Sequence, residues 1–170
     1  MSFSSIERKA ITEFRAKVPD VQDWESSDAE YLRPAAPSTK GVFARQLIRR
    51  LAAEADVPVA SVPGRVGNRR RIGNAICEIK FSMESPARFQ QVRPPSNDYQ
   101  YLVGICVRPS YIRYWLIPAS DVTRLCEDDQ ITFQHAEGSR WFRAEPEQDD
   151  AFSGFRSVQK DFVEALAQMS

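Results

Sequence analysis

GRVGNRRRIGNAICEIKF, residues 64–81, is the stretch that decides the fold of this chain. Its second half alternates with the two-residue period of a β-strand, and one face of that strand is apolar. The apolar residues of this face are Ala75, Cys77, Ile79 and Phe81. Glu78 and Lys80 share the opposite face, shortly after a run of arginines. A carboxylate beside an ammonium on a rigid strand suits a site that binds a divalent metal and acts on a phosphate.

The length and composition are those of one globular domain. The chain has 170 residues, of which 42% are hydrophobic and 27% are charged, which is enough apolar material for a substantial core. The first ten residues lack the apolar core of a secretory signal, and no apolar run reaches the length of a membrane span. We therefore expect a cytoplasmic protein that does not enter a membrane.

The three cysteines agree with this location. Cys77, Cys106 and Cys126 are odd in number, and two of them lie inside apolar strand-like runs. These features predict small buried residues of a reducing compartment rather than a disulfide framework. No CxxC or Cys/His spacing indicates a zinc site.

The formal net charge of zero hides an uneven distribution of charge along the chain. Residues 40–93 contain 11 Lys and Arg against 4 Asp and Glu, whereas residues 117–170 contain 5 against 11. The basic third includes Glu78 and Lys80, so a local positive field surrounds the strand that carries them. Such a field attracts a phosphate backbone. The alternative is that the basic and acidic segments face each other in the fold.

The periodicity of the chain predicts an α/β or α+β fold with a central mixed sheet flanked by helices. The predicted helices cover residues 4–17, 40–55, 85–93, 120–126 and 155–169. The predicted strands cover residues 57–62, 75–81, 99–107, 111–118, 130–135 and 139–143. Thr39 or Ser38 is the expected cap of the helix at 40–55. Pro86 opens the helix at 85–93, whose apolar residues are Phe89 and Val92.

We divide the chain at residue 38. Residues 1–38 are expected to form an N-terminal helix and an irregular arm rich in proline and acids, with Trp24 and Tyr31 as possible anchors on the body. Residues 39–170 are expected to form a single domain. No internal repeat or low-complexity segment interrupts it.

On this pattern, residues 40–118 resemble the restriction-endonuclease-like PD-(D/E)xK nucleases. The strings that carry the resemblance are EIKFS at 78–82, FQQVR at 89–93 and YQYLVGI at 99–105. The later pair Gln134-His135 resembles a piece found in some restriction enzymes of this type. The shared core of these nucleases is a helix, a three-stranded meander, a second helix and a further strand.

The resemblance implies a Mg²⁺ or Mn²⁺ site. Glu78 would bind the metal, with the backbone carbonyl of Ile79 as a further ligand, and Lys80 would activate the attacking water or stabilise the charge on phosphorus. The family pattern also requires an acid about ten residues before Glu78, where this chain has Asn68 and no carboxylate from residue 57 to 77. The glutamate often found on the first helix is absent too, and Glu54 or Asp56 could replace it only if the helix end folds back towards the strand.

The resemblance and the basic segment together imply contacts to DNA. The expected DNA-binding residues are Arg65, Arg69, Arg70, Arg71, Gln90 and Arg93. Each of these residues also has a structural explanation. The arginines could form a solvated hairpin tip, and Gln90 and Arg93 could lie on an exposed helix face. Glu78 and Lys80 could likewise be an ordinary surface ion pair. His135 is the only histidine and no nucleophile motif accompanies it, so we expect it on the surface or in contact with DNA.

The leading hypothesis is a metal-dependent DNA endonuclease in which Glu78, Lys80 and Asn68 form the catalytic site. The missing acid favours an alternative, a nuclease fold that has lost cleavage and binds DNA or a partner protein. A third possibility is a protein–protein module whose basic and acidic halves pair in an assembly. An active nuclease of this size would need a second copy or a partner subunit to cut both strands of a symmetric site.

Overall fold

The computed structural model of the 170-residue chain describes residue 24 and residues 27–63, 68–95, 98–128, 132–136 and 139–169. The helices are α3 (Pro37–Glu54), α4 (Ala119–Glu127) and α5 (Gln159–Ala167), with short 3₁₀ turns η1 (Glu30–Leu32) and η2 (Ser153–Phe155). The first strands are β1 (Val59–Ser61), β2 (Arg69–Ile72), β3 (Ala75–Ser82), β4 (Ala87–Val92) and β5 (Tyr101–Val107). The last are β6 (Ile112–Pro118), β7 (Thr132–Ala136), β8 (Ser139–Ala144) and β9 (Arg156–Ser157).

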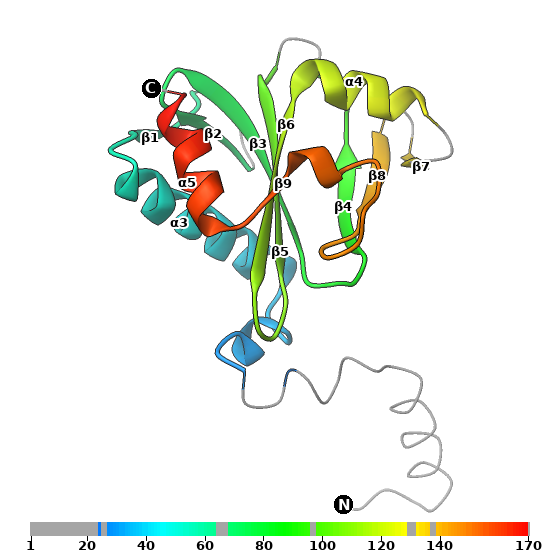
Figure 1. Cartoon of the computed structure of the whole chain (residues 1–170), viewed down its shortest axis with the longest axis horizontal. Coiled ribbons are helices and arrows are strands. Elements are labelled where there is room, and N and C mark those ends of the chain that lie inside the picture. Colours follow the sequence, from blue (N-terminus) through cyan, green and yellow to red (C-terminus); the bar gives the residue numbers. More distant parts are fainter. Residues whose placement is uncertain are drawn as a thin grey trace, which may run out of the picture.

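The strands form two sheets (Figure 1). The larger has six strands in the order β1-β2-β3-β5-β6-β9, and the smaller has three in the order β4-β8-β7. Strands β1, β2 and β3 form an antiparallel meander, whereas β3 and β5 run parallel because the chain crosses through β4 between them. The prediction of an α+β fold with a mixed sheet flanked by helices is confirmed.

The hairpin between β2 and β3 depends on Gly73. Ile72 pairs with Ala75, so only Gly73 and Asn74 lie between the strands. Gly73 has a φ of 55°, a left-handed conformation that glycine adopts without steric cost. This two-residue turn sets the register in which Arg69 lies directly opposite Glu78.

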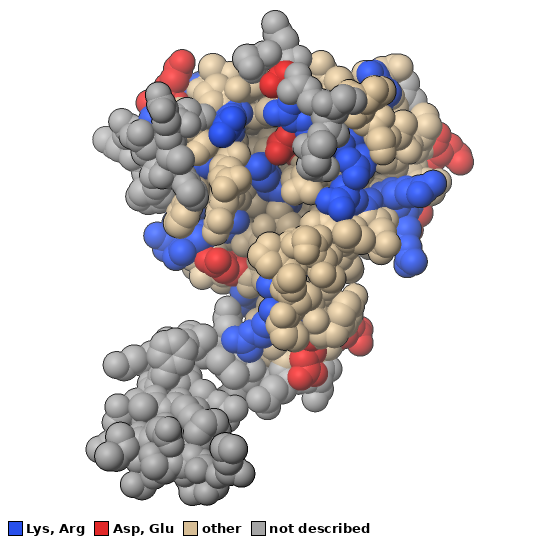
Figure 2. All heavy atoms as spheres, turned by 180° about the vertical axis from the view of Figure 1, so that it is seen from behind, with Lys and Arg blue, Asp and Glu red and all other residues tan. Residues whose placement is uncertain are grey.

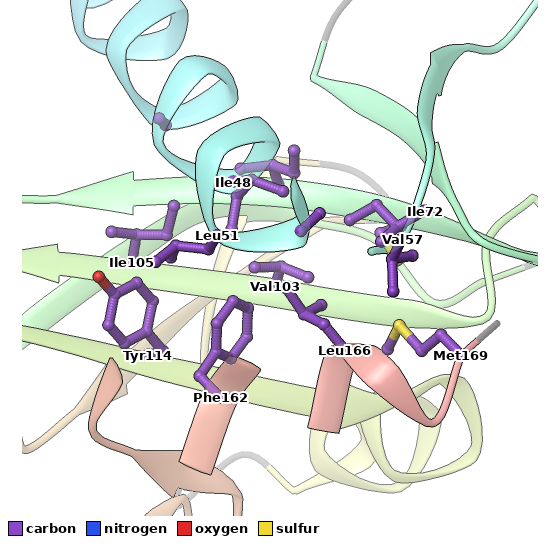
Figure 3. Packing of buried hydrophobic residues seen from close by; sticks show 14 of the residues in the cluster. Ile48, Leu51, Val57, Ile72, Val103, Ile105, Tyr114, Phe162, Leu166 and Met169 are labelled. Carbon is purple, nitrogen blue, oxygen red and sulfur yellow. The ribbon is translucent and has the colours of Figure 1, made fainter. Parts of the chain in front are cut away.

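One face of the large sheet is covered by α3 and α5, which pack against each other (Figure 1). Figure 3 shows Ile48 of α3 above the sheet residue Val103, and Phe162 of α5 beside Tyr114 of β6. The rings of Tyr114 and Phe162 are stacked, with centroids 4.7 Å apart. Phe162 belongs to the apolar face of the helix predicted at 155–169. Its side chain is fully buried and packs α5 against the sheet.

The opposite face of the large sheet is covered by the small sheet and α4. Residues of β5 alternate between the two layers: Val103 and Ile105 belong to the α3/α5 side, and Leu102 and Cys106 belong to the other side. Both sets are fully buried. The apolar run at 101–107 therefore marks a strand covered on both faces.

The predicted helix at 85–93 is wrong, because this segment is the strand β4. Phe89 pairs with Phe142 and Val92 with Arg140, so two residues of β4, Gln90 and Gln91, lie opposite one residue of β8. This β-bulge places two buried apolar residues three positions apart, a spacing that is typical of a helix. Pro86, expected as the first residue of a helix, instead precedes the strand.

The predicted helix at 4–17 lies outside the described residues, and the boundaries of the other helices differ in smaller ways. Helix α3 begins at Pro37 and its N-cap is Ala36, so neither Thr39 nor Ser38 is the cap. Proline is favoured at the first helical position because its fixed φ suits a helix. Helix α5 begins at Gln159 rather than at residue 155, because residues 153–155 form η2 and β9 pairs with β6.

Of the two expected anchors of the arm, one is buried. Trp24 is 2% exposed and lies in the same cluster as Leu32, with the guanidinium of Arg108 5.9 Å from its ring centroid. Tyr31 is 64% exposed, so it is not buried against the body of the protein as Trp24 is. The division of the chain at residue 38 stays a prediction. Among the described residues, no helix is long and apolar enough to span a membrane.

The buried cysteines predict a loss of stability at alkaline pH. Burial raises the pKa of Cys77 from 9.0 to about 12, and burial likewise raises that of Cys126 to about 11. The unfolded chain releases these protons above about pH 9 while the folded chain keeps them, so the contribution of the two thiols to stability is constant below that pH and falls as pH rises further. We expect urea unfolding to show a lower free energy of unfolding at about pH 10.5 than at about pH 8. Equal values would contradict this, and Cys77→Ala should reduce the difference.

Candidate functional site

Strand β3 brings Glu78 and Lys80 together with Arg69 of β2. Arg69 Nε donates to Glu78 Oε2 at 2.7 Å, and Lys80 Nζ lies 3.2 Å from Glu78 Oε1. The side chains are only 15–19% exposed, so solvent screens these contacts less than at an open surface. Both carboxylate oxygens of Glu78 therefore contact a cation.

Arg69 extends this network to the loop before β5. Its Nη1 lies 3.3 Å from Asp98 Oδ2, and its guanidinium carbon lies 5.7 Å from the ring centroid of Tyr99. Burial acts to lower the pKa of Arg69, but hydrogen bonds and charges from Glu78 and Asp98 outweigh it and raise the pKa above its ordinary value. The Tyr99 hydroxyl donates to the carbonyl of Arg93 at 2.7 Å, which ties the start of this loop to its end.

Lys80 has a second contact that depends on the bulge in β4. Its Nζ donates to the backbone carbonyl of Gln91 at 3.0 Å. Gln91 has a φ of 53°, a left-handed conformation that is uncommon for a residue other than glycine and costs of order 1 kcal/mol. The bulge thus directs a backbone oxygen at Lys80 and holds the ammonium between Gln91 and Glu78.

Beside Lys80 is a cleft of about 510 Å³ between the first turns of α3, the end of β3 and β4. Its lining residues are Pro37, Lys40, Gly41, Asn68, Lys80, Phe81, Ser82, Met83, Glu84, Arg88, Gln90 and Gln91. Three of these side chains are cationic and one is acidic, a balance of +2 (3 − 1). Figure 2 shows the molecule from behind, where Lys and Arg side chains lie among several Asp and Glu side chains.

Asn68 lies at the edge of this cleft but faces a cation. Its Oδ1 accepts a hydrogen bond from Arg45 Nη1 of α3 at 2.6 Å. A Cβ at Gly41 would lie 3.3 Å from Arg45 Nη1 and 3.4 Å from Asn68 Oδ1, so a larger residue there would require a small shift of the Arg45 side chain.

The remaining predicted site residues are dispersed around this centre. Arg71 is exposed on β2, and Arg93 is exposed after β4. Burial and the charge of Arg45 lower the pKa of Arg70. The Ile79 side chain is buried, and its amide donates to the carbonyl of Asn68 at 3.1 Å. Arg65 lies outside the described residues.

Two further residues that the sequence predicted for the site are placed by their backbone alone. Gln134 and His135 lie in β7, which belongs to the small sheet and not to the sheet that contains β3.

Asp98 was not predicted, although it belongs to the network of Glu78 and Arg69. The available signal was its place as the last carboxylate before the strand β5, whose parallel pairing with β3 brings Asp98 within reach of Arg69.

These donors, as arranged, do not fit a Mg²⁺ or Mn²⁺ ion. Such ions require several oxygen ligands, at least one of them anionic. Glu78 contacts two cations, and the Asn68 oxygen accepts from a guanidinium, so an ion at either position would meet positive charge. Within the described ranges, no group of three or more His, Cys, Asp or Glu side chains could hold a metal.

Comparisons with known proteins leave the family open. No protein-family model matches the sequence, and no curated protein matches it. Among solved structures, the chain is similar to one titled "Crystal Structure of MepB", with a TM-score of 0.38 and 14% sequence identity. That similarity covers 74% of this chain and 93% of the other. It carries no argument about function.

Proposed function

We propose that this chain binds DNA at the cleft beside Lys80, through its phosphate backbone and without hydrolysing it. The observation that carries the proposal is the cationic lining: Lys40, Lys80 and Arg88 border one cavity that contains a single acid, Glu84. Phosphate contacts from lysine and arginine supply most sequence-independent affinity for DNA. This is the alternative that the missing acid favours in the sequence.

The elements around the cleft add to its positive field. Helix α3 carries Arg49 and Arg50 on its exposed surface and has one acid, Glu54, in its last turn. Arg71 is exposed on β2. These cations lie on elements that border the cleft or pair with β3, with Arg49 and Arg50 more than two turns along α3 from the lining residues Lys40 and Gly41. The topology also supports a nuclease-like scaffold, because a helix and a three-stranded meander precede a parallel strand, with β4 in place of the second helix.

The contacts of Glu78 support binding rather than cleavage. Arg69 and Lys80 neutralise this carboxylate, and Lys80 is also held by the carbonyl of Gln91. A carboxylate whose two oxygens each contact a cation acts as the partner in structural ion pairs. We derive no catalytic step for the site, and the metal-dependent endonuclease stays a prediction that the following experiment also tests.

Fluorescence anisotropy with a labelled DNA oligonucleotide tests the proposal. Three phosphate contacts predict that the logarithm of the association constant falls with the logarithm of salt concentration with a slope of about −2.7. Mg²⁺ is not expected to strengthen binding relative to EDTA, because no metal takes part, and as a counterion of DNA it should weaken binding. Absence of binding at low salt would contradict the proposal, and a defined oligomer in light scattering would then favour the protein–protein module.

The cleavage arm uses supercoiled plasmid, linear duplex and single-stranded DNA with Mg²⁺ and with Mn²⁺. We expect every form to stay intact. Metal-dependent cutting that disappears in Glu78→Ala and in Lys80→Ala, with both variants folded, would replace our proposal with the endonuclease. In that case the oligomeric state would be measured next, to find whether the chain acts as a homodimer or with a partner subunit.

A further inference from the structure

The cleft contains an aromatic and a thioether side chain that phosphate binding does not require. Phe81 and Met83 line it at and just beyond the end of β3, and both are only partly buried. The ring of Phe81 packs edge-to-face with Phe43 of α3, with centroids 5.9 Å apart and planes at 78°. This contact fixes the ring, so the cleft has a rigid apolar wall beside its cations.

Two side-chain amides lie across the same cleft. Gln90 and Gln91 both line it and are exposed, because the bulge in β4 interrupts the alternation that would otherwise bury one of them. An amide offers donors and an acceptor together, which matches the edge of a nucleobase. Gln91 is further positioned by the bond from Lys80 to its carbonyl.

We infer that the cleft accommodates an unpaired nucleotide, with its base against Phe81 and Met83, its base edge near Gln90 and Gln91, and its phosphate near Lys40 and Arg88. This inference rests on the proposed DNA binding and specifies its substrate class. The volume of about 510 Å³ is within the range of sites that enclose one small ligand. The two cations come from α3 and β4, which border the cleft together with the end of β3.

The base must be unpaired for a physical reason. In a duplex, the faces of the bases stack on one another and their Watson–Crick edges are paired, so only the backbone and groove edges are accessible. A single strand exposes base faces, and an aromatic ring in a cationic groove is the arrangement that binds them. The expected preference is therefore for single-stranded DNA over duplex DNA of the same length.

Anisotropy with single-stranded and duplex forms of one labelled oligonucleotide tests this inference, with wild type beside Phe81→Leu. The leucine keeps an apolar side chain but removes the aromatic face. We expect Phe81→Leu to weaken single-strand binding about 5-fold or more and to leave duplex binding and the salt slope unchanged. Phe155→Leu is the matched control, because Phe155 is also a partly buried aromatic and packs in the other cluster.

A second measurement leaves the protein unchanged. Abasic sites placed through the single strand keep its phosphates and remove its bases, and we expect them to weaken wild-type binding by a similar factor. Equal wild-type affinity for abasic, single-stranded and duplex DNA would overturn the inference and leave the proposed DNA binding intact. No affinity for any form would overturn both.

Discussion

Gly104→Ala is expected to lower the free energy of unfolding by about 1–3 kcal/mol, although it adds only one methyl group. A Cβ at Gly104 of β5 would lie 2.7 Å from Cε2 and Cζ of Phe89, closer than non-bonded carbon atoms approach. The ring cannot move aside cheaply, because Phe89 is fully buried and packs edge-to-face with Trp115 at 5.4 Å. The strain therefore falls on the contact between the two sheets.

Thermal unfolding measures this effect. For a chain of this size, the midpoint should fall by roughly 2–4 °C for each kcal/mol lost. Gly154→Ala is the matched control, because a Cβ at Gly154 meets no atom within 4 Å. Since alanine also reduces the entropy of the unfolded chain, the control should leave stability unchanged or slightly higher. An unchanged midpoint for Gly104→Ala would mean that Phe89 and the small sheet do not pack on β5 as described.

The double variant Lys80→Gln/Arg88→Gln is expected to weaken DNA binding by up to about 30-fold at low salt. We assign each lost phosphate contact up to about 1 kcal/mol, and two such losses correspond to that factor. The salt slope should become shallower by about 1 for each lost phosphate contact. Both cations line the cleft, and both have an acidic partner, Glu78 for Lys80 and Glu84 for Arg88.

Arg124→Gln/Lys160→Gln is the matched control for that experiment. It also removes one arginine and one lysine, which pair with Asp121 and Glu164 on α4 and α5, away from the cleft lining. The net charge changes equally in the two variants, so a difference between them reports the position of the charge. Equal loss of affinity in both would show that DNA binds by overall charge and not at the cleft.

Local sequence determined the parts of the fold that depend on short-range pattern. Alternation at 75–81 determined which face of β3 carries Glu78 and Lys80, because successive side chains of a strand point to opposite sides. The continuous apolar run of β5 determined a strand buried on both faces, and hence a layered α+β fold. All three cations that line the cleft, Lys40, Lys80 and Arg88, come from the basic segment at residues 40–93.

Tertiary structure decided the features that join distant residues. The spacing of Phe89 and Val92 suits a helix, and only pairing with β8 makes it a bulged strand. Asp98 meets Arg69 through the parallel pairing of β3 and β5, and Asn68 meets Arg45 through the packing of α3. The sequence places the Glu78 carboxylate beside the Lys80 ammonium. How many cations contact Glu78 depends on the pairing between strands, which leaves no local pattern in the sequence.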